Sequence, residues 1–334
     1  MKEKQFFDAT KQRALRGAYL LYGAEEYTKQ EAVDRVVSLL DPSLRDMNLV
    51  KLDAPDWQAL TEASEQLPFF DELRVVLISG FKDKELTEGA QAFEKIRGFD
   101  PIERLIGNRE SILLFLRRGS GGSSEFQKRM QQADRAVEFA ELDEDRCVQM
   151  VKSRTACKGA KIDGATARLL VEMVGTDGYR LKNEIDKVCD YVGTGNVISS
   201  EAIRTVVTPS VEYNAFTMFG AFLSGNKKNG MRILQTVLNS GEENPMRVAS
   251  FLSGRLRLML MAREMLDAKR PKAEILARLG GNPKAAEIAV KNAQSLNTAK
   301  LRAAVAAFSE VNALVKQGEL RDTDALALAI FRSF

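Results

Sequence analysis

The sequence predicts an α/β domain followed by two all-helical domains. Up to about residue 140, short apolar runs alternate with segments of helical length, a pattern typical of a parallel sheet covered by helices on both faces. After Glu141 the strand signals stop. The chain has 334 residues, of which 45% are hydrophobic, and this is too long for one typical core. We therefore expect domains over residues 1–140, 141–210 and 211–334.

The first domain contains five short runs that are nearly continuous in apolar character. Their length and their enrichment in β-branched and aromatic residues favour strands over helices. We expect strands at residues 18–22, 48–52, 74–78, 111–116 and 136–139.

The remainder of the chain shows helical spacing interrupted by glycines. In the small domain we expect helices at residues 147–157, 163–174 and 180–192. In the larger domain we expect five or more, at residues 213–223, 227–239, 245–269, 283–294 and 298–317, with a last one after Asp322.

Two adjacent aromatic residues, Phe69 and Phe70, occupy a turn that should be polar. Pro68 biases Leu67 away from helical dihedral angles, so the preceding helix should end at Leu67. Neighbouring side chains in an extended segment point opposite ways, so at most one ring can face the core. Either both rings cap the sheet, or one faces outward and enters a partner. The helix before the turn has one apolar face, formed by Trp57, Leu60, Ala63, Ser64 and Leu67.

The composition excludes several classes of function. The chain has no histidine, which removes the commonest general base and the commonest zinc ligand. The net charge is only +3, too small for a protein that binds nucleic acid by its overall charge. Three cysteines without CxxC spacing favour free thiols in a reducing cytoplasm. Neither a secretion signal nor a membrane-spanning segment is indicated.

A phosphate-binding loop is missing after the first expected strand. Residues 23–30 read GAEEYTKQ, with one glycine and two carboxylates where GxxxxGK[ST] would supply amides and a lysine. We expect no working nucleotide site and no cofactor, and we expect Lys29 to be a solvated helix residue. Residues 119–124, GSGGSS, read as a surface loop rather than an anion site. The acidic run 143–145 reads as helix capping rather than as metal ligands.

The best candidate for a contact with DNA phosphate lies in the long helix expected at residues 245–269. Arg255, Arg257 and Arg263 are among seven basic residues between positions 247 and 272. Apolar residues interleave with them at helical spacing, which is also how a packed helix with a solvated or subunit-packing basic face looks. Both interpretations stay open, with the second favoured.

Three segments together resemble the DNA polymerase III delta subunit family. They are YLLYGAEEY at residues 19–27, the turn at 67–70 followed by Arg74-Val75-Val76, and LKNEIDK at 181–187. Their order and spacing match as well, and the resemblance covers essentially the whole chain. Two departures are Leu73, where the family often has a basic residue, and a stretch over residues 81–108 that is longer than expected.

The resemblance implies an AAA+-like domain without a phosphate loop, a small helical lid domain and a C-terminal helical collar domain that joins a ring of subunits. It implies a clamp-loader subunit of the polymerase III holoenzyme that binds the sliding clamp, the beta subunit, and opens one interface of that ring for loading on primed DNA. The clamp-binding residues of the family fall on Leu67, Phe69 and Phe70. ATP hydrolysis belongs to partner subunits of the gamma/tau and delta-prime type, so this chain would be a non-catalytic subunit.

Two alternatives remain. One is a nucleotide-hydrolysing motor with a degenerate first loop, which tight binding of an ATP analogue would support. The other is a helical adaptor that holds DNA through Arg255, Arg257 and Arg263, which a steep salt dependence of DNA affinity would support.

Overall fold

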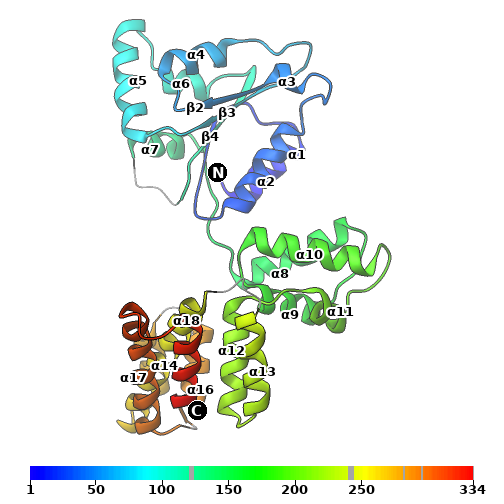
Figure 1. Cartoon of the computed structure of the whole chain (residues 1–334). Coiled ribbons are helices and arrows are strands. Elements are labelled where there is room, and N and C mark those ends of the chain that lie inside the picture. The colour runs from blue at the N-terminus through cyan, green and yellow to red at the C-terminus, as the bar shows by residue number, and fades with distance from the viewer. Residues whose placement is uncertain (120–123, 240–243, 281–282, 295, 334) are drawn as a thin grey trace. The chain divides into compact units, whose positions relative to one another are not determined.

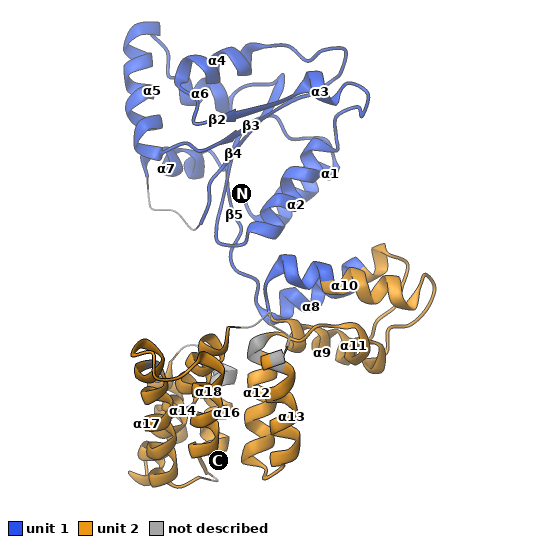
Figure 2. Ribbon diagram, in the orientation of Figure 1, with its two compact units in different colours: residues 1–154, 176–183 blue, residues 155–175, 184–334 orange. Residues whose placement is uncertain are grey.

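The computed structural model describes residues 1–119, 124–239, 244–280, 283–294 and 296–333. Most of the stretch interpreted as a surface loop, residues 120–123, lies outside these ranges. The chain divides into two compact units (Figure 2): residues 1–154 with 176–183, and residues 155–175 with 184–334. This division cuts through the segment 141–210, so the three-domain division stays a prediction.

The first unit contains a five-stranded, wholly parallel sheet in the order β2-β3-β4-β1-β5. Figure 1 labels β2, β3 and β4 of this sheet. All five expected strands are present within one or two residues of their predicted bounds. They are β1 (Gly17–Tyr22), β2 (Leu49–Asp53), β3 (Arg74–Ser79), β4 (Ser111–Leu116) and β5 (Ala136–Glu138).

Helices cover both faces of this sheet, as the continuous apolar character of the strands predicted. On one face, Tyr19 and Leu21 of β1 pack with residues of α1 (Glu3–Lys11) and α2 (Glu26–Val37). On the other face, Leu20 and Tyr22 pack with residues of α4 (Trp57–Glu65), α5 (Asp83–Arg97), α6 (Pro101–Ile106) and α7 (Glu125–Gln132). A short helix, α3 (Arg45–Asn48), leads into β2.

The long stretch 81–108 consists of α5 and α6, which belong to this second layer. Leu86 and Ala90 of α5 are buried in the core, and the Leu86 carbonyl accepts a 2.7 Å hydrogen bond from the Trp57 indole. The segment that departs from the family pattern is therefore an integral part of the α/β unit.

After β5 the described residues form helices and connecting segments without a further strand of the sheet. In the region 141–210 they are α8 (Glu144–Cys157), α9 (Gly164–Val174), α10 (Gly178–Val192) and α11 (Ser200–Val206). Further on they are α12 (Val211–Leu223), α13 (Lys227–Asn239), α14 (Pro245–Asp267), α15 (Lys272–Leu279), α16 (Pro283–Gln294), α17 (Thr298–Lys316) and α18 (Asp322–Ser333). The short helices α11 and α15 were not predicted. Along α14, Leu252, Leu256 and Met259 anchor the core of the second unit.

None of the helices formed by the described residues is long and apolar enough to cross a membrane.

Candidate functional site

The turn between α4 and β3 exposes three large apolar side chains. We call residues 66–73 the plug turn. Its Leu67, Phe69 and Phe70 side chains are 69%, 48% and 84% exposed. The two rings pack edge to face, with their centroids 4.7 Å apart and their planes at 89°. Since exposed apolar groups grouped in one place mark interaction sites, the plug turn is the candidate site.

Two expectations about this turn were wrong in detail. The helix ends at Glu65, two residues earlier than expected, so Leu67 is not part of the buried face formed by Trp57, Leu60, Ala63 and Ser64. Both rings face solvent rather than one. The reason is that Phe70 has a φ of 49°, so the segment is not extended and the alternation of side chains does not apply.

The left-handed backbone of Phe70 is unfavourable for a residue with a side chain. For a non-glycine residue this conformation costs about 1–2 kcal/mol, and such strain persists only where the surrounding structure holds it.

Asn48, the last residue of α3, holds the plug turn from behind. Its side chain donates through Nδ2 to the Phe69 carbonyl at 2.9 Å and accepts from the Phe69 N–H through Oδ1 at 2.6 Å. Nδ2 also lies 3.3 Å from the Leu44 carbonyl. Asn48 is completely buried, so these bonds are shielded from water and fix the backbone of the turn.

Arg74, the first residue of β3, ties the beginning of the plug turn to α3. Its guanidinium donates to the Met47 carbonyl at 3.2 Å and to Oε1 of Gln66. The residue is buried, and burial lowers its pKa from the usual value. Met47 itself is 60% exposed, and Asn48, its neighbour in the chain, binds Phe69. Met47 is therefore an exposed apolar residue of the segment that holds the plug turn.

Acidic residues border the far end of the plug turn. Asp71 accepts the Asp41 N–H through Oδ2 at 3.0 Å and the Glu72 N–H through Oδ1 at 2.6 Å. Glu72 lies 3.9 Å from Arg13. Leu73, the residue that departs from the family pattern, is buried in the core of the sheet, so it contributes no charge to this border.

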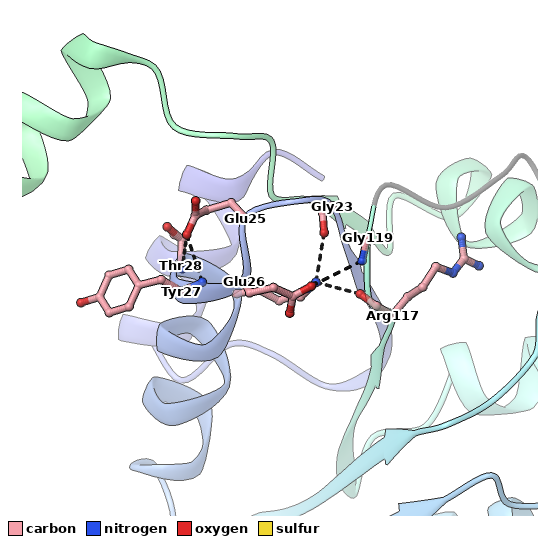
Figure 3. Close-up of polar contacts among 8 residues, drawn as sticks. Gly23, Glu25, Glu26, Tyr27, Thr28, Arg117 and Gly119 are labelled. Atoms are coloured by element: carbon pink, nitrogen blue, oxygen red, sulfur yellow. Dashed lines mark hydrogen bonds and ion pairs between the residues drawn. The ribbon is translucent and has the colours of Figure 1, made fainter. Parts of the chain in front are cut away.

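The segment that replaces a phosphate loop is filled by the chain's own side chains (Figure 3). Glu25 caps α2 by accepting the N–H groups of Tyr27 at 3.0 Å and Thr28 at 3.4 Å. Its carboxylate therefore occupies the helix N-terminus, where a bound phosphate would accept the same donors. Burial raises the pKa of Glu25 despite these hydrogen bonds.

The expectation that Lys29 is solvated was wrong. It is 4% exposed, and its ammonium donates to the carbonyls of Gly23 at 3.1 Å and Arg117 at 2.7 Å and pairs with Glu26 at 2.8 Å (Figure 3). The lysine therefore joins the carboxyl ends of β1 and β4 and offers no free charge to a phosphate.

Other candidates for chemistry are structural. Asp143 caps α8 by accepting the Arg146 N–H at 2.7 Å, which confirms the capping interpretation of the acidic run. No group of three metal-ligating side chains occurs among the residues that the structure describes. The cysteines are free thiols, with Cys147 and Cys189 buried. Burial raises the pKa of Cys147 to about 11, so this thiol is a poor nucleophile.

The three arginines proposed for DNA contact do not share one solvent-exposed face. Arg255 is half-buried, lies 5.1 Å from the Phe251 ring and lines a small apolar cavity between α12, α14 and α16. Arg263 pairs with Asp267 at 2.5 Å and lies 3.5 Å from the Ala293 carbonyl of α16. Only Arg257 is fully exposed. This arrangement favours helix packing over a phosphate-binding surface.

Met47 and Asn48 are the residues that the sequence did not indicate. Both lie some twenty positions before the plug turn, and Asn48 was expected to begin a strand. A polar residue at the start of an apolar run could have indicated a buried hydrogen-bonding role, but only the fold shows its partner.

Comparison with known proteins gives consistent results. The family model of the DNA polymerase III delta subunit matches residues 19–141, and the model of the C-terminal domain of that subunit matches residues 212–333. The curated DNA polymerase III subunit delta of Bacillus subtilis is 23% identical over 310 residues, which are 90% of this chain and 88% of the relative.

The solved structure of a delta protein gives the same result for the fold. The Bacillus subtilis DNA clamp loader delta protein has a TM-score of 0.64 and 21% identity, over 99% of each chain. The RuvB Holliday junction branch migration motor of Thermotoga maritima has a TM-score of 0.36 and 12% identity, over 61% of this chain and 65% of that one. The architecture expected from the sequence, a parallel α/β sheet followed by helices, is confirmed, and it is the fold of the Bacillus subtilis DNA clamp loader delta protein.

Proposed function

Because this chain belongs to the DNA polymerase III delta subunit family, we propose that it is the clamp-loader subunit that binds the sliding clamp and opens the ring. The plug turn makes the contact, with Leu67, Phe69 and Phe70 entering an apolar pocket on one clamp protomer. The main support is that these three side chains are exposed together while buried polar residues hold their backbone.

The energy available from the plug is sufficient for specific binding. Burying one such side chain contributes roughly 1.5–3 kcal/mol by area, and aromatic anchors in desolvated pockets are typical hot spots. The turn is also ordered before binding, because Asn48 fixes Phe69 and Arg74 fixes Gln66. Less conformational entropy is then lost when the partner binds.

Opening the ring requires that the plug binds the open or strained clamp more tightly than the closed one. A ligand shifts an equilibrium between two states only by its differential affinity for them. No covalent chemistry is involved, so the chain needs no active site for this function.

We propose that the chain has no catalytic activity of its own. The carboxylate of Glu25 fills the helix N-terminus that a phosphate would use, and Lys29 is engaged with two carbonyls and a carboxylate. ATP binding by gamma/tau and delta-prime type subunits, which also hydrolyse it, would expose or hide the plug turn through the C-terminal helices. The assembly would act on primed DNA in the cytoplasm, where the free thiols stay reduced.

The alternatives receive less support. A nucleotide-hydrolysing motor would need an open anion site, but the Glu25 carboxylate occupies the helix N-terminus where a phosphate would bind. A DNA-holding adaptor would need Arg255 and Arg263 on an exposed face.

The test is binding of the purified chain to the sliding clamp of the same organism, measured beside the Phe69→Ala, Phe70→Ala double variant. Loss of two anchors should weaken binding about a hundredfold or more, while thermal stability stays near wild type because both rings are exposed. A matched control is Ile96→Ala, which removes an 80% exposed side chain from α5. Equal affinity of the double variant and the wild type would exclude the plug.

A further inference from the structure

An open groove of ≈ 660 Å³ in the first unit is lined by four arginines, Arg13, Arg16, Arg109 and Arg135. We call it the arginine groove. Its residues come from the connections that lead into β1, β4 and β5, so it lies at the amino ends of these three strands. Nothing in the proposed function uses it.

Two of the arginines are held in place by neutral groups. Arg135 lies 4.6 Å from the Tyr19 ring and donates to the Tyr19 hydroxyl and, at 2.8 Å, to the Arg16 carbonyl. Arg16 donates to the carbonyls of Arg13 at 3.1 Å and Leu15 at 2.6 Å. These contacts order the guanidinium groups without neutralising their charge, and each leaves further N–H donors unused.

Few carboxylates compensate this charge. The Asp134 carboxylate, next to Arg135, pairs with the amino group of Met1. Glu72 reaches Arg13 only at 3.9 Å, and both side chains are largely solvated. Arg109 is exposed and has no ion pair among the residues that the structure describes, although Glu110 follows it in the chain. The groove is therefore a net positive site with ordered donors.

The arginine groove is continuous with the plug turn. The plug turn leads into β3, so its end lies at the same edge of the sheet, next to β4 in the strand order. Two contacts place the sites near each other: Asn108 in the groove donates to the Ser64 carbonyl of α4 at 2.8 Å, just before the plug turn, and Arg13 lies 3.9 Å from Glu72 within the turn.

We propose that the arginine groove binds carboxylates on the same clamp protein that buries the plug. An exposed apolar centre beside a charged, solvated border is the anatomy of a protein–protein interface. A nucleic acid is the less fitting occupant, because its interfaces are polar and highly charged throughout and would leave four exposed apolar residues unused. The inference rests on the proposed function, since it names a second set of contacts to the same partner.

Charges at the border of an interface act mainly on the rate of encounter. Complementary charge raises association rates above those of neutral surfaces and makes them fall with salt. The groove would therefore guide the clamp toward the plug turn and orient it, whereas the plug provides the slow dissociation.

The experiment measures association rates of the full chain with the clamp by stopped flow, from low to physiological salt. The variants are Arg109→Glu and the double Arg13→Glu, Arg109→Glu. Neither side chain makes a hydrogen bond within the described parts of the chain. Arg13 lies 3.9 Å from Glu72 of the plug turn, so the single Arg109→Glu variant tests the groove without a change beside that turn. Lys84→Glu and the double Lys82→Glu, Lys84→Glu are matched controls, because both lysines are exposed and pair with exposed glutamates of α5, Glu85 and Glu88. We expect the groove double variant to associate about tenfold more slowly at low salt, with a flatter salt dependence, and the controls to match wild type.

Three results would overturn the inference. The groove variants could associate with the clamp at the wild-type rate, or the control variants could associate as slowly as the groove variants. The groove variants could also bind the clamp normally but lose affinity for a fluorescent DNA duplex, which would make nucleic acid the occupant. Failure of the proposed function is distinguishable, because in that case the wild type does not bind the clamp, or the Phe69→Ala, Phe70→Ala variant binds it as well as wild type.

Discussion

Phe70 combines a left-handed backbone with a large side chain that is 84% exposed. Neither property favours folding: the conformation favours glycine, and a ring that is 84% exposed buries little area. Strained residues of this kind cluster at binding sites, where the surrounding structure holds them. At the scale of the single residue, these two properties support the proposal that Phe70 enters a partner.

Replacing Phe70 with glycine should stabilise the protein and weaken its function. Glycine relieves the strain of the positive φ, so we expect the free energy of unfolding in urea to rise by about 1 kcal/mol. Clamp binding should weaken about tenfold or more, because one anchor is lost.

The matched variant is Phe70→Ala, which removes the ring but keeps a side chain in the left-handed region. It should bind the clamp as weakly as the glycine variant without the gain in stability. A glycine variant that is less stable than wild type would show that the ring contributes to folding.

At the scale of elements, the plug turn depends on α3, which precedes it by some twenty residues. Asn48 is buried and makes two hydrogen bonds to the Phe69 backbone. Helix, strand and turn are therefore connected by one side chain that has no contact with solvent. Its role would be to position the plug rather than to touch the clamp.

Asn48→Ala should affect both stability and binding. Buried polar groups of Phe69 would lose their partner, which costs about 1–3 kcal/mol of unfolding free energy. The plug would also lose its preorganisation, so we expect clamp affinity to fall about tenfold, measured by titration below the unfolding temperature. Gln58→Ala, which removes an exposed side chain of α4, is the control. Wild-type affinity in a destabilised Asn48→Ala variant would exclude the positioning role.

Lys29 connects β1, α2 and β4 in a similar way. Lys29→Met keeps the length of the side chain but leaves the carbonyls of Gly23 and Arg117 without this donor. We expect the free energy of unfolding to fall by about 2–4 kcal/mol. We also expect that the variant, like the wild type, binds no nucleotide. The control is Lys84→Met, the same substitution at an exposed lysine, whose free energy of unfolding should stay near that of the wild type. If Lys29→Met were as stable as wild type, the ammonium would have no structural role.

The periodicity of the sequence predicted the elements well and their ends less well. All five strands were found because a buried parallel strand has an almost continuous apolar run, a local signal. Leu67 was assigned to the buried face of α4 because its spacing fits a helix, yet α4 ends at Glu65, two residues before Leu67. The short helices α11 and α15 have too few turns for a clear period.

Long-range contacts explain the other errors. Lys29 looked like a solvated helix residue, because no local pattern shows that the carbonyls of Gly23 and Arg117 meet around its ammonium. The side chains of Phe69 and Phe70 were expected to point opposite ways, as in an extended chain, but the positive φ of Phe70 breaks this alternation. The plug turn itself could be identified from sequence because two aromatics in a turn are unusual, whereas Asn48 and Met47 required the fold.

At the scale of the whole molecule, the proposed contact site lies within one unit of the chain. The first unit contains the plug turn and the arginine groove at one edge of its sheet, and the second unit is a helical assembly around α14. The chain's own carboxylate and lysine fill the segment where a related fold would bind phosphate. These features support the proposal that the chain acts by binding and leaves hydrolysis to its partners.

The central claim is that the plug favours the open ring. It is tested most directly by comparing the affinity of the wild-type chain for the intact sliding clamp with its affinity for single clamp protomers, obtained by disrupting the ring interface. We predict tighter binding to the protomer, because part of the binding energy is used to open the intact ring. Equal affinity for the two forms, or tighter binding to the closed ring, would contradict the account.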